Sequence, residues 1–233
     1  MPGDGALANL ITAALSGRFP DADGGWRRVR PWRQGLEAII AFTGHAVFAV
    51  ELDIPDDQLA SLGADGFGGA HNPRLVTSLA GPAAWIDCLD MLMARRGTGR
   101  ADAPPRLVER PDLAAHPRAR FAARLRDEPR VLGYEDRCRS AVVVLGKGVA
   151  GLTEIGFELE PGRRGQGAGA DLVGDGLSAV PAGHPVVAAV SPGNAASVRV
   201  LLSAGFVPLG SLQLFRRTGC DRGPGLPTLA RGG

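Results

Sequence analysis

Cysteine is scarce in this sequence, and its few copies are scattered. The 233 residues include three cysteines, Cys88, Cys138 and Cys220, and no two of them form a CxxC pair. Without such pairs the sequence predicts neither a zinc site nor a disulfide framework. An odd number of thiols fits a reducing compartment, so we expect a cytoplasmic protein without a bound metal.

Long apolar runs and a strong excess of charge are also missing. No apolar segment approaches the length of a membrane span, and residues 1–10 lack the basic flank and long apolar core of a secretory signal. The formal net charge is +2, which gives no reason to expect nucleic-acid binding through bulk charge. The arginines of residues 26–32 form a short run that we interpret as an exposed strand face. We expect neither a membrane nor a nucleic acid as a partner.

Lysine is nearly absent as well, because Lys147 is the only one in the sequence. Arginine, alanine, glycine and proline are abundant instead, which is typical of a GC-rich bacterial genome. This composition reflects codon usage and predicts nothing about mechanism.

A segment rich in glycine, proline and charge, residues 95–105, predicts a domain boundary. We expect an N-terminal α+β domain over residues 1–100, a second domain over residues 105–217 and a flexible tail over residues 218–233. Within the first domain the pattern predicts four features. They are a helix at 6–15, a hairpin of 38–42 with 45–52, a glycine-rich loop at 63–73 and a helix at 84–95.

The second half has a sharper alternation of elements. Hydrophobic period and turn residues predict strands at 106–109, 130–134, 140–145, 149–159, 186–190 and 206–216, and helices at 112–126, 167–180 and 194–204. The second of these helices follows a glycine-rich loop at residues 161–169. This order predicts an α/β domain with a mixed sheet.

The glycine loop is the strongest signal for chemistry. Gly165, Gly167 and Gly169 alternate with other residues and lead into a helix. Without Cβ atoms, successive N–H groups can converge on one anion, and the helix N-terminus adds its dipole. This construction suits a pyrophosphate. A P-loop would need GK followed by Ser or Thr, and a dinucleotide site would need a preceding βαβ strand and a later acid, so coenzyme A is the better ligand.

The residues of this loop resemble a known motif. The run Arg164-Gly-Gln-Gly-Ala-Gly169 fits the (Gln/Arg)-x-x-Gly-x-(Gly/Ala) pattern of the GNAT superfamily of N-acetyltransferases. Asn194-Ala-Ala-Ser197 followed by Gly205-Phe206 resembles a second block of that family. The resemblance covers roughly residues 106–217. It implies a mostly antiparallel GNAT-type sheet flanked by helices, and the N-terminal part is a candidate for a degenerate half of the same architecture.

The resemblance also implies a set of residues that bind acetyl-CoA. They are Phe157, Glu158, Leu159, Arg163, Arg164, Gly165, Gln166, Gly167, Ala168, Gly169, Asn194 and Ser197. Asn194 also suits a helix N-cap, and Gly205-Phe206 suits the end of a helix and the start of a buried strand.

Glu154 is the candidate catalytic residue. An acid in the half-buried part of a strand is costly unless it is solvated or useful. In some family members a glutamate near this place removes a proton from the acceptor amine, directly or through water. The alternative is a solvated acid on an open sheet face, and Glu158 shares that face by alternation. Where many family members carry a tyrosine that protonates the departing thiolate, this chain has Leu201.

Two histidines are weaker candidates. His45 and His71 are candidates to line a substrate cleft, although a lone histidine is more often structural.

The sequence thus predicts an acetyl-CoA-dependent N-acetyltransferase that moves an acetyl group to an unidentified amine by direct attack on the thioester. A main-chain N–H near residues 156–158 would polarise the thioester carbonyl. Its partners would be acetyl-CoA and the amine, and a homodimer is compatible with this function. A non-catalytic acyl-CoA-binding or sensing module is the second hypothesis, and an enzyme that binds a dinucleotide is the third.

Overall fold

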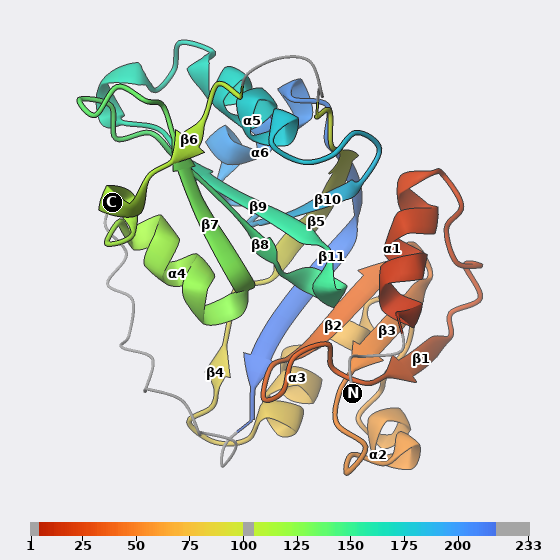
Figure 1. Cartoon of the computed structure of the whole chain (residues 1–233). Helices are drawn as coiled ribbons and strands as arrows, with labels where there is room; N and C mark the ends of the chain where they lie inside the picture. The colour runs from red at the N-terminus through yellow and green to blue at the C-terminus, as the bar shows by residue number, and fades with distance from the viewer. Residues whose placement is uncertain (1–4, 100–104, 218–233) are drawn as a thin grey trace. The chain divides into compact units, whose positions relative to one another are not determined.

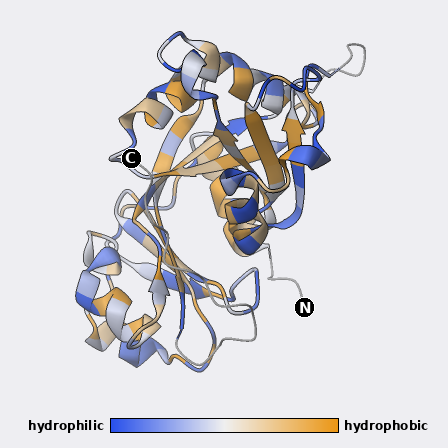
Figure 2. Ribbon diagram, turned by 90° about the vertical axis from the view of Figure 1, so that its left-hand side faces the viewer, coloured by the Kyte–Doolittle hydropathy of each residue, from blue (hydrophilic) through white to orange (hydrophobic). Residues whose placement is uncertain are grey.

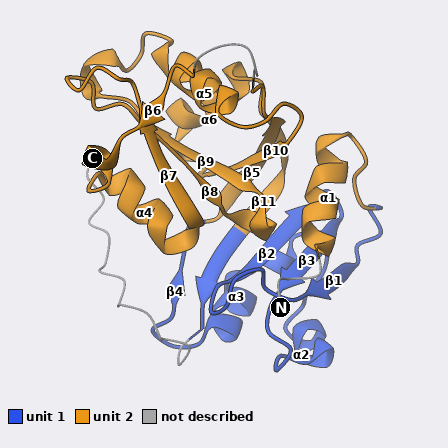
Figure 3. Cartoon of the chain, in the orientation of Figure 1, with its two compact units in different colours: residues 1–3, 21–88, 213–233 blue, residues 4–20, 89–212 orange. Residues whose placement is uncertain are grey.

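The computed structural model describes residues 5–99 and 105–217 and divides the chain into two compact units (Figures 1 and 3). Of the described residues, unit 1 holds 21–88 and 213–217, and unit 2 holds 5–20, 89–99 and 105–212. The division therefore falls at residues 88/89, upstream of the glycine- and proline-rich segment, and the N-terminal helix joins unit 2. Residues 100–104 and the predicted tail at 218–233 lie outside the described residues.

Unit 1 is an α+β unit built on a hairpin. Its described elements are β1 (Trp26–Val29), β2 (Glu37–Phe42), β3 (His45–Ala49), α2 (Asp56–Ser61), η1 (Gly69–His71), α3 (Pro73–Ala80), β4 (Trp85–Ile86) and the end of β11 (Val207–Arg216). The antiparallel pairing of β2 with β3 confirms the predicted hairpin. Its turn needs a left-handed residue, and Gly44 supplies it with φ of +71°. Strand β1 pairs in parallel with β3.

Unit 2 holds the glycine loop. Its described elements are α1 (Ala6–Leu15), β5 (Asp90–Arg96), β6 (Val108–Glu109), η2 (Pro111–Leu113), α4 (Pro117–Leu125), β7 (Asp127–Gly133), β8 (Val142–Lys147), η3 (Val149–Gly151), β9 (Thr153–Glu158), η4 (Pro161–Arg163), α5 (Ala168–Ser178), β10 (Pro185–Val190), α6 (Ala195–Ser203) and the start of β11. The strand order is β11-β5-β10-β9-β8-β7-β6. Among these described neighbours, β9 and β10 are parallel and the other pairs are antiparallel. The predicted fold class, a mostly antiparallel mixed sheet flanked by helices, is confirmed.

The helix predicted at residues 84–95 is wrong, because this stretch forms strands β4 and β5. Strand β5 lies between β10 and β11 and pairs antiparallel with both. Leu92, Met93 and Ala94 are fully buried there. A strand buried on both faces is a continuous apolar run, which periodicity alone does not distinguish from a buried helix segment.

Helices cover both faces of the unit 2 sheet. Val143 of β8 and Ile155 of β9 pack in a core cluster with residues of α5 and α6. Val142 and Val144 of β8 pack instead against Ala119 and Ala122 of α4. Neighbouring residues of one strand point to opposite faces, so α4 lies on one face and the α5–α6 pair on the other. Figure 2 shows the matching concentration of hydrophobic residues in the strands.

The remaining predicted elements are found with shifted ends. The helix predicted at residues 112–126 begins at Pro117, which occupies its first turn, where proline has no N–H to lose. The prediction that the N-terminal part is a degenerate half of the same architecture stays a prediction, although residues 26–49 do contribute strands. Among the described helices, none is long and apolar enough to cross a membrane.

Candidate active site

The glycine loop lies between β9 and α5 and is exposed. Gly165 and Gly167 adopt left-handed φ values of +79° and +81°, and Gly167 caps α5. The backbone N–H groups of residues 165–167 donate to no acceptor among the described residues. Free N–H groups next to a helix N-terminus are the arrangement that binds an anion. Side chains other than glycine would be strained at both positions.

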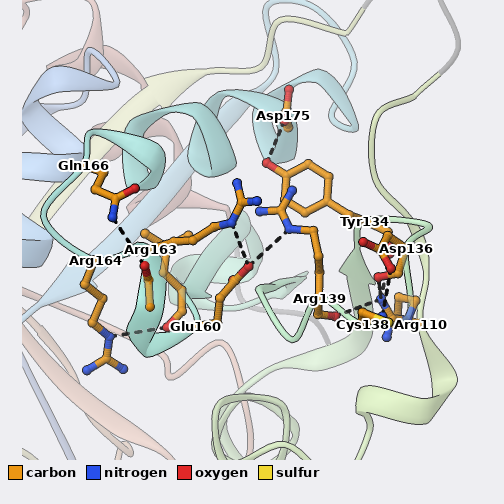
Figure 4. A network of polar contacts seen from close by, with 12 residues as sticks. Arg110, Tyr134, Asp136, Cys138, Arg139, Glu160, Arg163, Arg164, Gln166 and Asp175 are labelled. Carbon is orange, nitrogen blue, oxygen red and sulfur yellow. Dashed lines mark hydrogen bonds and ion pairs between the residues drawn. The ribbon is translucent and has the colours of Figure 1, made fainter.

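Each of the two arginines of the loop lies near a glutamate, and Figure 4 shows the pair of Arg163 with Glu160. Arg163 Nε lies 3.6 Å from Glu160, and Arg164 Nη2 lies 3.4 Å from Glu158. Both arginine side chains are more than half exposed. Exposed pairs of this kind contribute less than about 1 kcal/mol each, so a phosphate could draw either guanidinium away.

Gly169 lets α5 approach α6 closely. A Cβ atom at this position would lie 2.6 Å from Val200 Cγ2 and 3.5 Å from Leu159 Cδ1. The third glycine of the motif therefore has a packing role, whereas the first two shape the exposed loop.

A polar network, for which no sequence pattern provided a signal, anchors the start of this loop (Figure 4). Arg139 donates to Glu160 at 3.2 Å and lies over the ring of Tyr134, 3.6 Å from its centroid. The Tyr134 hydroxyl donates to Asp175 of α5 at 3.1 Å. Burial, and then Asp175, raise the pKa of Tyr134. The single tyrosine of the sequence thus supports the loop and α5.

Strands β9 and β10 diverge after a short stretch of pairing. In the described strands the pairs Thr153–Val186 and Glu154–Val187 form the whole parallel ladder, although β9 continues to Glu158 and β10 to Val190. The backbone of β9 from Ile155 onward consequently has one edge that no strand covers. This is the strand splay expected for a thioester arm that enters between two strands.

The carboxylate of Glu154 is buried and accepts hydrogen bonds from two donors. Its carboxylate accepts from Arg126 Nη2 at 2.7 Å and from the Val149 N–H at 3.1 Å, and the whole residue is 8% exposed. Arg126 also donates to Val144 O at 3.2 Å. Gly156 makes room for the guanidinium, because a Cβ there would lie 3.0 Å from Arg126 Nη1. These contacts indicate that Glu154 holds Arg126 in place beneath the splay.

The other residues predicted on β9 divide between its two faces. Glu158 shares the α4 face with Glu154, as predicted, and is about one-third exposed. Its second carboxylate oxygen lies 4.0 Å from Arg118 Nε of α4. Phe157 and Leu159 pack partly against the cluster beneath α5 and α6. Arg118 and Arg126 had no sequence signal, since nothing distinguishes them among the many other arginines.

Asn194 is the N-cap of α6, which is the structural role that the sequence also suggested for it. Its side-chain oxygen accepts from the Ser197 N–H at 3.1 Å. Leu201, at the position of the usual tyrosine, is 1% exposed and packs in the core under the sheet. No proton donor stands at that place.

The two histidines lie in unit 1. His45 Nδ1 is 3.0 Å from Asp23 Oδ1, and this hydrogen bond lowers the pKa of Asp23. Burial lowers the pKa of His71 to about 4, so it is neutral at physiological pH. Within the described residues, no group of three or more His, Cys, Asp or Glu side chains could hold a metal ion.

Comparison with known proteins gives structural likenesses alone. No protein-family model matches the chain, and no curated protein does. A protein of Novosphingobium aromaticivorans assigned to the GNAT family of acetyltransferases is 18% identical, with a TM-score of 0.39 over 59% of this chain and 69% of that one. A GCN5-related N-acetyltransferase from Kribbella flavida is 14% identical, with a TM-score of 0.38 over 62% and 63%. A Drosophila protein is 13% identical, with a TM-score of 0.42 over 76% and 61%.

This chain spans less than two thirds of the Kribbella and Drosophila proteins. Because the identities are low and the TM-scores lie under 0.5, the residues of this chain have to carry any argument about function.

Proposed function

We propose that this protein is an N-acetyltransferase that uses acetyl-CoA as its acetyl donor. One observation carries the proposal: three backbone N–H groups at residues 165–167, with no close acceptor among the described residues, precede α5, directly after a strand that β10 leaves uncovered beyond Glu154. The loop would take the pyrophosphate, with Arg163 and Arg164 released from their glutamates toward it. The uncovered edge of β9 would align the amides of the pantetheine arm.

The acetyl group would then lie where β9 and β10 diverge, close to Gly156 and the buried guanidinium of Arg126. A main-chain N–H of residues 156–158 would polarise the thioester carbonyl. The amine would attack the carbonyl carbon directly, forming the C–N bond as the C–S bond breaks and the thiolate of CoA leaves. The amine must lose its proton, because a protonated amine has no lone pair.

The base for this proton is predicted to be Glu154, acting directly or through water. The ion pair of Glu154 with Arg126 favours a different role, in which Glu154 holds Arg126 in place. Glu158 lies on the same face, is partly exposed, and is the other carboxylate to consider as the base. A Glu154→Gln variant separates these roles. An unchanged pH profile of kcat would remove Glu154 as the base, whereas loss of the fall in kcat toward low pH would establish it.

Calorimetric titration with acetyl-CoA tests the binding site. We expect micromolar binding by the wild-type protein and a loss of at least tenfold in Gly167→Ala, where the new Cβ lies on the exposed loop at a strained φ. Gly162→Ala is the matched control: it lies in the same loop, has open space around its Cβ and no positive φ. Equal binding by both variants, or no binding by the wild type, would refute the site.

A non-catalytic acyl-CoA-binding module is the second candidate. The observation that favours it is Leu201, a buried core residue where a thiolate-protonating tyrosine would be expected. Free-thiol release from acetyl-CoA in the presence of an amine panel distinguishes the two. Binding without thiol release for any amine would favour the module.

A further inference from the structure

Arg118 stands on the face of the unit 2 sheet where β9 and β10 diverge. It belongs to the first turn of α4, which packs on β7, β8 and β9. A Cβ built on Gly156 would lie 3.4 Å from Arg118 Cδ. The side chain therefore crosses β9 at the uncovered stretch, next to Arg126.

The guanidinium of Arg118 has no close hydrogen-bonding partner among the described residues. It donates no hydrogen bond to a described residue, its Nε is buried, and the nearest carboxylate oxygen, on Glu158, is 4.0 Å away. Arg126 on the same face contrasts with it, because Arg126 meets Glu154 at 2.7 Å. Arginine carries five N–H donors in a fork that fits a carboxylate. Arg118 therefore has N–H groups that donate to no described residue, and about one-third of its side chain is exposed.

The charges around Arg118 are balanced. Arg118, Arg126 and Arg164 stand with the carboxylates of Glu154, Glu158 and Asp90. Burial lowers the pKa of Arg118, with Arg126 acting in the same direction and Glu158 and Asp90 acting against it. Arginine nevertheless remains charged in proteins. A ligand that brings one positive and one negative group adds no net charge to such a cluster, whereas a dianion would meet three carboxylates.

We propose that Arg118 binds a carboxylate of the acceptor, so that the acceptor is an amine of the amino-acid class. This inference rests on the proposed function and names its substrate. The Arg118 fork would hold the carboxylate, and Glu158, the carboxylate 4.0 Å from Arg118, would face the ammonium before it loses its proton. The amine nitrogen would thereby be directed toward the uncovered edge of β9, where the acetyl group would lie.

Paired acceptors test this specificity. Thiol release from acetyl-CoA is measured with L-amino acids and with their α-carboxamides, which keep the amine and remove the negative charge. We expect the wild-type protein to prefer the acids at least tenfold in kcat/KM. In Arg118→Gln the value for the acids should fall about 10- to 100-fold, mainly through KM, because a hydrogen-bonded charge pair is lost. The value for the amides should change less than threefold.

Arg120→Gln is the matched control, since it removes an exposed arginine two residues along the same helix. It should leave the preference unchanged. Equal use of acids and amides by the wild-type protein would overturn the proposal. An equal loss for both acceptor classes in Arg118→Gln would overturn it as well.

A binding measurement separates this inference from the proposed function. The same acids and amides are titrated calorimetrically into the protein saturated with CoA, which requires no turnover. Absence of thiol release with every acceptor would count against the acetyltransferase. Acid-selective binding that Arg118→Gln abolishes would still establish the carboxylate site, and unselective binding would refute it.

Discussion

Replacing Arg126 by methionine removes the positive charge that faces Glu154 in the interior of unit 2. The two side chains meet at 2.7 Å, and Arg126 and Glu154 are 5% and 8% exposed as residues. The methionine fills much of the space of the arginine stem but leaves the carboxylate without its counter-charge. Removing one partner of a buried ion pair typically costs about 3–5 kcal/mol.

For a protein of this size, each kcal/mol lowers Tm by about 2–4 °C, so we expect Arg126→Met to lower Tm by roughly 6–20 °C. Glu154→Leu should cost a similar amount, because it leaves the guanidinium unpaired. The double variant Arg126→Met/Glu154→Leu should regain most of the loss, since two well-packed apolar side chains can replace a buried pair at little cost.

Thermal and urea denaturation of the four proteins measures this cycle. Arg130 with Glu109 is a matched control in the same unit: the pair is 2.8 Å apart but more than half exposed. Arg130→Met should cost less than about 1 kcal/mol. If Arg126→Met cost no more than Arg130→Met, or if the two single losses simply added in the double variant, the reasoning about the buried pair would be refuted.

Three further outcomes are expected. Gly176→Ala should destabilise by about 1–3 kcal/mol, because its Cβ would lie 3.0 Å from a valine methyl of β8; Gly174→Ala, in open space on the same helix, should stabilise by about 0.5–1 kcal/mol in thermal denaturation, and equal effects would contradict the packing. Burial raises the pKa of Glu37 from 4.5 to about 7. The folded state therefore binds this proton more tightly than the unfolded chain, and the free energy of unfolding should fall by about 3 kcal/mol as pH rises across that interval. Urea titrations of Glu37→Gln should lack this fall, and an identical pH dependence would exclude Glu37 as its source. Tyr134→Phe should cost about 1.5–3 kcal/mol in urea denaturation through its lost bond to Asp175, whereas an unchanged midpoint would show that water replaces that bond.

Local patterns determined much of this protein. The helix at residues 6–15 follows from its apolar spacing, and the β2–β3 hairpin from two apolar runs around Thr43-Gly44. The glycine loop can be recognised in the sequence because its conformation depends on residues without Cβ atoms, at Gly165 and Gly167. These signals lie within a few residues of the structure that they produce, so the sequence is enough to read them.

The tertiary structure decided what depends on distant partners. Residues 90–96 form a strand because β10 and β11 pair with both of their edges. Glu154 could be singled out as a costly acid, but its partner Arg126 lies 28 positions away and resembles every other arginine in the sequence. The Arg118 guanidinium, whose Nε is buried without a hydrogen bond to a described residue, was hidden for the same reason. A side chain's burial and charge partners are set by the packing of elements far apart in sequence, which local periodicity and composition do not encode.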